Sequence, residues 1–147
     1  LVKDKDFIYF SNNKNKFYSV NMKNGTIHWT NKINSTMSPI LIGDYIFTIS
    51  NEGYLFTIQK NLGNIIRIND IYKIYDKKKK SKVKPIGFTV ADNNLFLTSN
   101  DGKIMMIELM TGNIVKFQKI SKNVISKPFI HNENLFVIKN GSIIQYN

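Results

Sequence analysis

Residues 93–117 read NNLFLTSNDGKIMMIELMTGNIVKF. This stretch holds three short apolar runs, joined by one turn at residues 100–102 and a second at residues 110–113. Apolar runs bounded by Asn, Asp and Gly are typical of strands, and an Asp-Gly pair favours a tight hairpin because glycine accepts a positive φ. The stretch therefore predicts a three-stranded antiparallel meander.

The same pattern occurs elsewhere in the chain. Residues 45–68 read YIFTISNEGYLFTIQKNLGNIIRI, residues 7–29 read FIYFSNNKNKFYSVNMKNGTIHW, and a further copy begins at Asn134. The second turn of each complete copy contains one glycine, namely Gly25, Gly63 and Gly112. These glycines are separated by 38 and 49 residues. Spacings of this size indicate a repeat architecture.

The prolines and the remaining turn glycines follow the same repeat. Each proline opens a short apolar run just before a meander: Pro39, Pro85 and Pro128. Proline is tolerated at the first residue of a strand, so each unit is predicted to have four strands with proline marking the first. Further glycines fall in the first turn of a meander: Gly53, Gly102 and Gly141. We interpret all of these residues as structural repeat positions.

The repeat predicts four units, which span residues 1–35, 36–84, 85–126 and 127–147. The first unit is expected to lack its first strand, and the fourth to lack its last. Residues 70–84 form a lysine-rich insertion. Its lysine run is expected to be a solvated loop, because like charges repel and stay hydrated: Lys77, Lys78, Lys79 and Lys80. For residues 71–75 two interpretations stay open, a helical turn or a cover over a sheet edge.

Runs such as YIFTI and IMMIEL are apolar at nearly every position, which indicates strands covered on both faces. Four-stranded antiparallel units that are sandwiched by their neighbours are the blades of a β-propeller, and the unit length fits a blade. The predicted fold class is all-β, with about three and a half blades of a larger ring.

Composition restricts the function only loosely. The formal net charge is +11, and the chain contains no cysteine, which excludes disulfides and thiolate metal sites. The positive charge could indicate an anionic partner. Lys, Asn and Ile are all abundant, however, so a general bias in composition explains the positive charge better than a nucleic-acid-binding surface does. No apolar run has the roughly 18 residues that a membrane-spanning helix needs.

No catalytic, cofactor-binding or metal-ligating set emerges from the sequence. The carboxylates at the strand entries are expected to cap turns: Asp6, Asp44, Asp92 and Glu133. His28 and His131 share no metal-ligand spacing and lie beside no candidate nucleophile. Trp29 is expected to pack between blades, with its indole N–H bound to a backbone carbonyl.

The turn residues resemble the repeat of the PQQ-like (quinoprotein) propeller family. The segments that carry the resemblance are MKNGTIHW (residues 22–29) and SNDGKIMMIELMTGNIVKF (residues 99–117). Where the family prefers tryptophan, this chain is interpreted as keeping Trp29 and replacing it by Ile68 and Phe117 in the next copies. Residues 127–147 are similar to the end of the propeller lipoproteins of the bacterial outer-membrane β-barrel assembly machinery.

This resemblance implies an eight-bladed propeller on the periplasmic face of the outer membrane. It implies a non-enzymatic scaffold without a cofactor, which binds the barrel-inserting subunit, the insertase, through loops between blades. It implies contact with the membrane only peripherally, through a lipid anchor upstream of Leu1 where one is present. No partner-contacting residue can be carried over to this sequence.

Two alternatives stay open at this point. One is a fragment of a PQQ-dependent dehydrogenase, whose quinone would lie with a calcium ion at the propeller axis. The other is a binder of nucleic acid or anionic surfaces that uses residues 77–80, for which binding would fall steeply with salt.

Overall fold

The computed structural model describes residues 1–12 and 14–146 of the chain. Residue 147, the last of the predicted fourth unit, therefore lies outside the described residues, as does residue 13. The chain divides into two compact units, Leu1–Asp70 and Ile71–Asn147, and each is described by itself.

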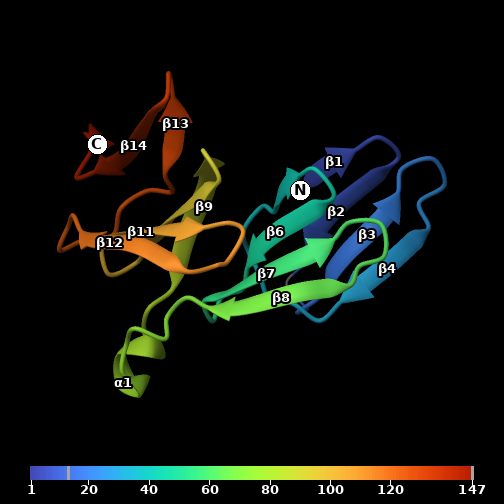
Figure 1. Ribbon diagram of the computed structural model, residues 1–147, viewed down its shortest axis with the longest axis horizontal. Helices are drawn as coiled ribbons and strands as arrows, with labels where there is room; N and C mark the ends of the chain where they lie inside the picture. Colours follow the sequence, from blue (N-terminus) through green and yellow to red (C-terminus); the bar gives the residue numbers. More distant parts are fainter. Residues whose placement is uncertain (13, 147) are drawn as a thin grey trace. The chain divides into compact units, whose positions relative to one another are not determined.

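The first unit consists of two four-stranded antiparallel sheets (Figure 1). The first sheet contains, in spatial order, β1 (Val2–Asp4), β2 (Phe7–Ser11), β3 (Phe17–Asn21) and β4 (Ile27–Asn31). The second sheet contains β5 (Ile40–Ile42), β6 (Tyr45–Ile49), β7 (Tyr54–Gln59) and β8 (Ile65–Asp70). One core joins the two sheets, with these residues at its centre: Tyr9, Phe17, Ile33, Ile46 and Ile58.

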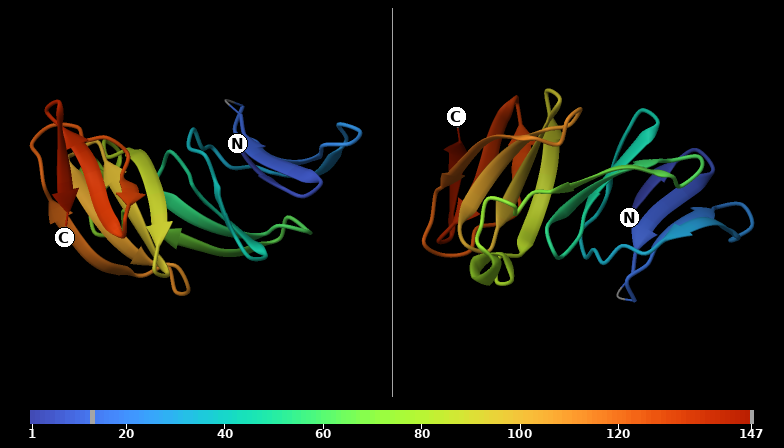
Figure 2. Two further views of the ribbon diagram at one scale, coloured as in Figure 1. Left: turned by 90° about the horizontal axis from the view of Figure 1, so that it is seen from above. Right: turned by 60° about the horizontal axis from the view of Figure 1, so that its bottom comes forward.

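The second unit begins with the insertion, which contains the short helix α1 (Lys77–Lys80). The third sheet follows with β9 (Pro85–Ala91), β10 (Asn94–Ser99), β11 (Lys103–Glu108) and β12 (Ile114–Lys119). The fourth sheet has three strands, β13 (Phe129–His131), β14 (Asn134–Lys139) and β15 (Ser142–Tyr146). Figure 2 shows these two sheets packed face to face, and their shared core contains Ile104, Leu135 and Val137. The predicted all-β fold of four-stranded antiparallel units is confirmed.

The turns that end the third strands have the same geometry in three sheets. In each, the glycine N–H donates to the carbonyl four residues earlier, over 2.7–2.8 Å. The φ angles of Gly25, Gly63 and Gly112 are +71°, +73° and +71°. Glycine adopts this left-handed conformation without the steric cost that a Cβ would bring. The repeated glycines thus encode one repeated turn.

The prediction that the first unit lacks its first strand was wrong. Val2–Asp4 forms β1, which pairs antiparallel with β2 through the register Val2↔Tyr9 to Asp4↔Phe7. The hairpin turns at Lys5, whose φ is +46°. The charged sequence VKD carries no strand signal of its own, but ladder hydrogen bonds use backbone groups and need no apolar run.

The prediction of a solvated loop at residues 77–80 was also wrong in part. The lysines form α1, and Asp76 caps its N-terminus by accepting a hydrogen bond from the Lys79 N–H at 2.9 Å. Ile71 and Tyr72 are buried, so the insertion is anchored at its start. A single turn also forms within residues 71–75, where the Tyr75 N–H donates to the Tyr72 carbonyl at 3.0 Å, and α1 follows it behind the Asp76 N-cap.

Candidate functional site

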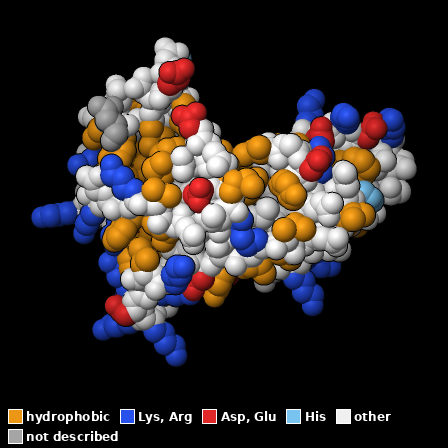
Figure 3. All heavy atoms as spheres, in the orientation of Figure 1, with side chains coloured by type: hydrophobic (Ala, Val, Ile, Leu, Met, Phe, Trp, Pro, Cys, Tyr) orange, Lys and Arg blue, Asp and Glu red, His pale blue; other side chains and the backbone are white. Residues whose placement is uncertain are grey.

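The lysine-rich insertion presents the most distinctive surface of the second unit. Lys77, Lys78 and Lys79 are exposed on α1, and Lys82 and Lys84 follow with exposed side chains of their own. Figure 3 shows basic side chains projecting at the lower left, where Figure 1 places α1. The surface can therefore attract an anionic or acidic partner.

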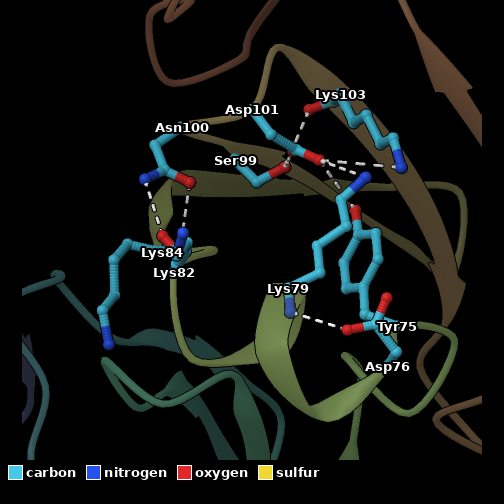
Figure 4. A network of polar contacts seen from close by, with 9 residues as sticks. All are labelled: Tyr75, Asp76, Lys79, Lys82, Lys84, Ser99, Asn100, Asp101 and Lys103. Atoms are coloured by element: carbon cyan, nitrogen blue, oxygen red, sulfur yellow. Dashed lines mark hydrogen bonds and ion pairs between the residues drawn. The ribbon is translucent and has the colours of Figure 1, made fainter.

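Asp101, in the β10–β11 turn, holds the insertion in place (Figure 4). One carboxylate oxygen accepts a hydrogen bond from the Ser99 hydroxyl at 2.7 Å. The other accepts one from the Tyr75 hydroxyl at 3.2 Å. The ammonium groups of Lys79 and Lys103 lie 3.7 and 3.6 Å from the same oxygen. A single carboxylate thus connects the helix, the segment before it and the sheet.

Asn100 makes a second connection beside the first (Figure 4). Its side-chain oxygen accepts a hydrogen bond from the Lys84 N–H at 2.8 Å, and its amide donates to the Lys82 carbonyl at 3.1 Å. Its backbone N–H donates to the Lys84 carbonyl at 2.9 Å. The end of the insertion is therefore fixed through its backbone, which leaves the lysine side chains available at the surface.

Lys103 is the buried cation of this network. Its ammonium group lies 4.4 Å from the Tyr75 ring centroid and 5.1 Å from that of Phe117, both within cation–π range. Burial lowers the pKa of Lys103, and Asp101 offsets this only in part. Loss of Asp101 would leave this cation without its carboxylate, which is costly for a buried charge.

The electrostatics of Asp101 predict how its contribution depends on pH. Burial raises the pKa of Asp101, but Ser99, Lys103, Tyr75 and Lys79 together bring it below the ordinary value. A carboxyl whose folded pKa is depressed stabilises the fold above its unfolded pKa, about 3.9, and this contribution disappears as the pH falls through the folded pKa.

We therefore expect Asp101→Asn to lower the free energy of unfolding of the second unit by about 1–3 kcal/mol at pH 7, from lost charge-assisted hydrogen bonds. The difference between wild type and variant should shrink as the pH falls below the unfolded pKa, about 3.9, and through the lower folded pKa of Asp101, where the wild-type carboxyl also becomes neutral. Urea unfolding followed by circular dichroism at several pH values measures it. A difference that stays constant with pH would contradict this role.

In the first unit, the most distinctive set of contacts surrounds the side chain of Trp29. The indole N–H donates to the Lys60 carbonyl in the β7–β8 turn at 2.8 Å, as the sequence predicted. The Asn31 amide donates to the Gly63 carbonyl in the same turn, also at 2.8 Å. The ring lies about 6 Å, centroid to centroid, from those of Tyr9 and Phe17. The first sheet is thereby docked on the second.

The structure corrects which residues replace this tryptophan in the next copies. The fourth strands β4, β8 and β12 each contain a bulge at their second residue, and Trp29, the third residue of β4, pairs with Ser19 across the ladder. The residues in the same register are Arg67, opposite Thr57, and Lys116, opposite Met106. The prediction of Ile68 and Phe117 was one residue too far along, because Trp29 lies four residues after Gly25, and the residues four after Gly63 and Gly112 are Arg67 and Lys116.

The other predicted positions lie as follows. Pro85 is the first residue of β9, and Pro39 and Pro128 directly precede β5 and β13. The carboxylates of Asp6 and Asp44 form ion pairs with Lys23 and Lys60, at 2.9 and 3.5 Å. These ion pairs differ from the backbone capping that was expected, because each turn brings a lysine within reach.

The two histidines lie in different units. His28 stacks on Phe7, with ring centroids 4.8 Å apart, and His131 ends β13 in the other unit. Within residues 1–12 and 14–146, no group of three His, Cys, Asp or Glu side chains could hold a metal ion. In the same described part, no helix is long and apolar enough for a membrane span.

Comparison with known proteins finds one matching family model and several structures with the same fold. Residues 1–69 match the family model described as outer membrane protein assembly factor BamB. The structure of BamB from Moraxella catarrhalis superposes with a TM-score of 0.75 at 13% identity, over 98% of this chain and 40% of that one. No curated protein matches the chain by sequence.

Two further solved structures share the fold. The β-propeller domain of Cps50 (Swd1) from Myceliophteria thermophila matches with a TM-score of 0.66 at 11% identity, over 90% of this chain and 45% of that chain. A europium-containing methanol dehydrogenase matches with a TM-score of 0.63 at 14% identity, over 78% of this chain and 23% of that one. The predicted partial β-propeller is confirmed, and the chain spans less than half the length of these structures.

Proposed function

Since residues 1–69 belong to the PQQ-like propeller repeat family, we propose that this chain is part of a non-catalytic scaffold for protein–protein interaction. Its role would lie in the assembly of β-barrel proteins on the periplasmic side of the bacterial outer membrane. The observation that carries the proposal is the match of residues 1–69 to the BamB family model. The chain spans 40% of the Moraxella catarrhalis protein, which supports a larger ring around these four sheets.

The partner of this scaffold would be the barrel-inserting subunit. Attachment to the membrane would be only peripheral, through a lipid anchor upstream of Leu1 where one is present. The likeness to methanol dehydrogenase is a likeness of fold, and folds of this kind host many activities. The test therefore has to separate a scaffold from an enzyme that binds a quinone.

These two possibilities are distinguished by crosslinking the full-length protein in its native envelope, followed by co-purification and mass spectrometry. The scaffold proposal expects the barrel-inserting subunit in the purified material, with crosslinks to loops between sheets. Recovery of the protein alone from a soluble fraction, with a bound quinone, would contradict the proposal and support the dehydrogenase alternative.

The lysine surface of α1 is the contact that we propose for the partner. Replacing Lys77 and Lys78 by glutamine is expected to weaken partner binding about two- to tenfold, the range for exposed ion pairs. Salt should weaken wild-type binding and have less effect on the variant. Lys79 is left in place because it contacts Asp101.

The matched control removes the same charge from the same unit. Lys119 and Lys122 are exposed and lie outside the insertion, so Lys119→Gln with Lys122→Gln lowers the net charge equally. The two double variants are compared by measuring how tightly the purified partner binds to the immobilised full-length protein at two salt concentrations. Equal weakening by both pairs would show that only net charge matters.

A further inference from the structure

A cavity of about 310 Å³ lies between the third and fourth sheets, within the second unit. Its wall is mostly apolar and comes from both sheets: Phe96, Ile104, Met106, Leu135 and Tyr146, with Lys116 at one side. The volume is at the lower end of the range for small-molecule pockets, about 300–1,000 Å³. The size suits a small ring system rather than a cofactor.

Two residues of the cavity wall correspond to the two residues whose rings flank the Trp29 indole in the first unit. Phe96 is the third residue of β10, as Tyr9 is the third residue of β2. Ile104 pairs with Gln118 on the fourth strand, as Phe17 pairs with Asn31. The two residues that flank the indole in the first unit thus have counterparts in the wall of this cavity.

Lys116 stands at one side of the cavity, at the position of Trp29. It has the register of Trp29, yet it has no ring with which to fill the space. Its side chain is exposed, and its ammonium group lies 5.9 Å from the Tyr146 ring centroid. The third sheet therefore keeps counterparts of the two residues that flank the indole, without the indole itself.

Three polar residues besides Lys116 also line the cavity: Gln118, Glu133 and Asn134. The Tyr146 hydroxyl donates a hydrogen bond to the Gln118 side-chain oxygen, which holds the tyrosine ring across the cavity. A bound ring would find apolar contacts on the faces of Phe96 and Tyr146 and a cation beside it in Lys116. Aromatic rings gain from both kinds of contact.

We propose that this cavity binds a small, neutral, planar aromatic molecule of the indole class. The ring would lie between Phe96 and Leu135, in the place that Trp29 takes in the first unit. This site is separate from the lysine surface proposed for the partner, so either proposal can fail without the other.

Titration of the full chain with free indole tests the proposal, followed by NMR of ¹³C-labelled methionine methyl groups. The five methionines give a built-in comparison, since Met106 lines the cavity and Met22, Met37 and Met110 do not. We expect a saturable ring-current shift of the Met106 methyl, with a Kd of about 0.1–1 mM, in keeping with the ligand efficiency of small fragments. Equal shifts at the distant methionines, or none at Met106, would overturn the proposal.

The variant Lys116→Trp supplies the missing ring from the chain itself. It should reduce indole binding at least tenfold and raise the Tm by about 2–8 °C, as expected for a cavity-filling change near 1 kcal/mol. Lys122→Trp adds the same residue at an exposed position and should change neither quantity. Unchanged indole binding in a folded Lys116→Trp protein would place the ligand elsewhere.

A second titration decides whether the ligand is a free small molecule or a tryptophan side chain of a polypeptide. Free indole should bind at least as tightly as N-acetyl-tryptophanamide, because the peptide groups have no place in a cavity of this size. A tighter affinity for the amide would overturn a small-molecule ligand and indicate a tryptophan side chain from a polypeptide.

Discussion

Replacement of Trp29 by alanine is expected to lower the free energy of unfolding of the first unit by about 3 kcal/mol, within the range for large-to-small aromatic changes. The loss has two parts, the ring contacts with Tyr9 and Phe17 and the hydrogen bond to the Lys60 carbonyl. Urea unfolding followed by circular dichroism measures it. Trp29→Phe, which keeps a ring and loses the N–H, should show a smaller loss, of which about 1 kcal/mol is the hydrogen bond.

The equivalent residue of the third sheet is the matched control. Lys116 has the same register, but its side chain is exposed and docks no neighbouring turn. Lys116→Ala should therefore change stability by less than about 0.5 kcal/mol, as surface substitutions do. If both alanine variants lost the same amount, the indole would not be the element that docks the first sheet on the second.

Replacement of Gly63 by alanine is the second change with a large expected effect. A Cβ at Gly63 would lie 2.6 Å from a Trp29 ring carbon, and the φ of +73° adds backbone strain. We expect a loss of about 2–5 kcal/mol, from overpacking and from a non-glycine residue in the left-handed region. Trp29 is the only tryptophan, so its fluorescence reports both unfolding and displacement of the ring.

Gly25 separates the two causes. Its φ is +71°, but a Cβ there would meet no atom within 4 Å. Gly25→Ala should therefore cost only the backbone strain, about 1–2 kcal/mol, and leave the native fluorescence of Trp29 unchanged. Equal losses in the two variants would mean that the contact with the indole adds nothing.

Most of the strand order could be predicted because each hairpin is determined by residues that are close together in the sequence. Alternation between apolar runs and turns with Asn, Asp and Gly sets each hairpin within a few residues, as at Asn94–Ser99 and Lys103–Glu108. The hydrogen bond of Trp29 to a backbone carbonyl could also be expected, since a buried indole N–H needs an acceptor. That acceptor, the Lys60 carbonyl, could not be named from the sequence.

What the sequence missed depends on backbone geometry. Val2–Asp4 pairs through groups that every residue carries, so its charged side chains gave no signal. The fourth strands of the first three sheets also share a one-residue bulge, which sets the ladder partners of Trp29, Arg67 and Lys116. A bulge changes which residues face each other without changing composition, and so leaves little trace in a sequence pattern.

The sequence by itself determined an all-β chain of repeated antiparallel hairpins with glycines at the turns, because these features arise from neighbouring residues. The tertiary structure alone decided which distant residues come into contact. Tyr75 and Asp101 are 26 residues apart, and Trp29 and Lys60 are 31 apart. The cavity beside Lys116 likewise needs walls from two sheets. Such sites form only when packing brings distant segments together, and no local pattern specifies that outcome.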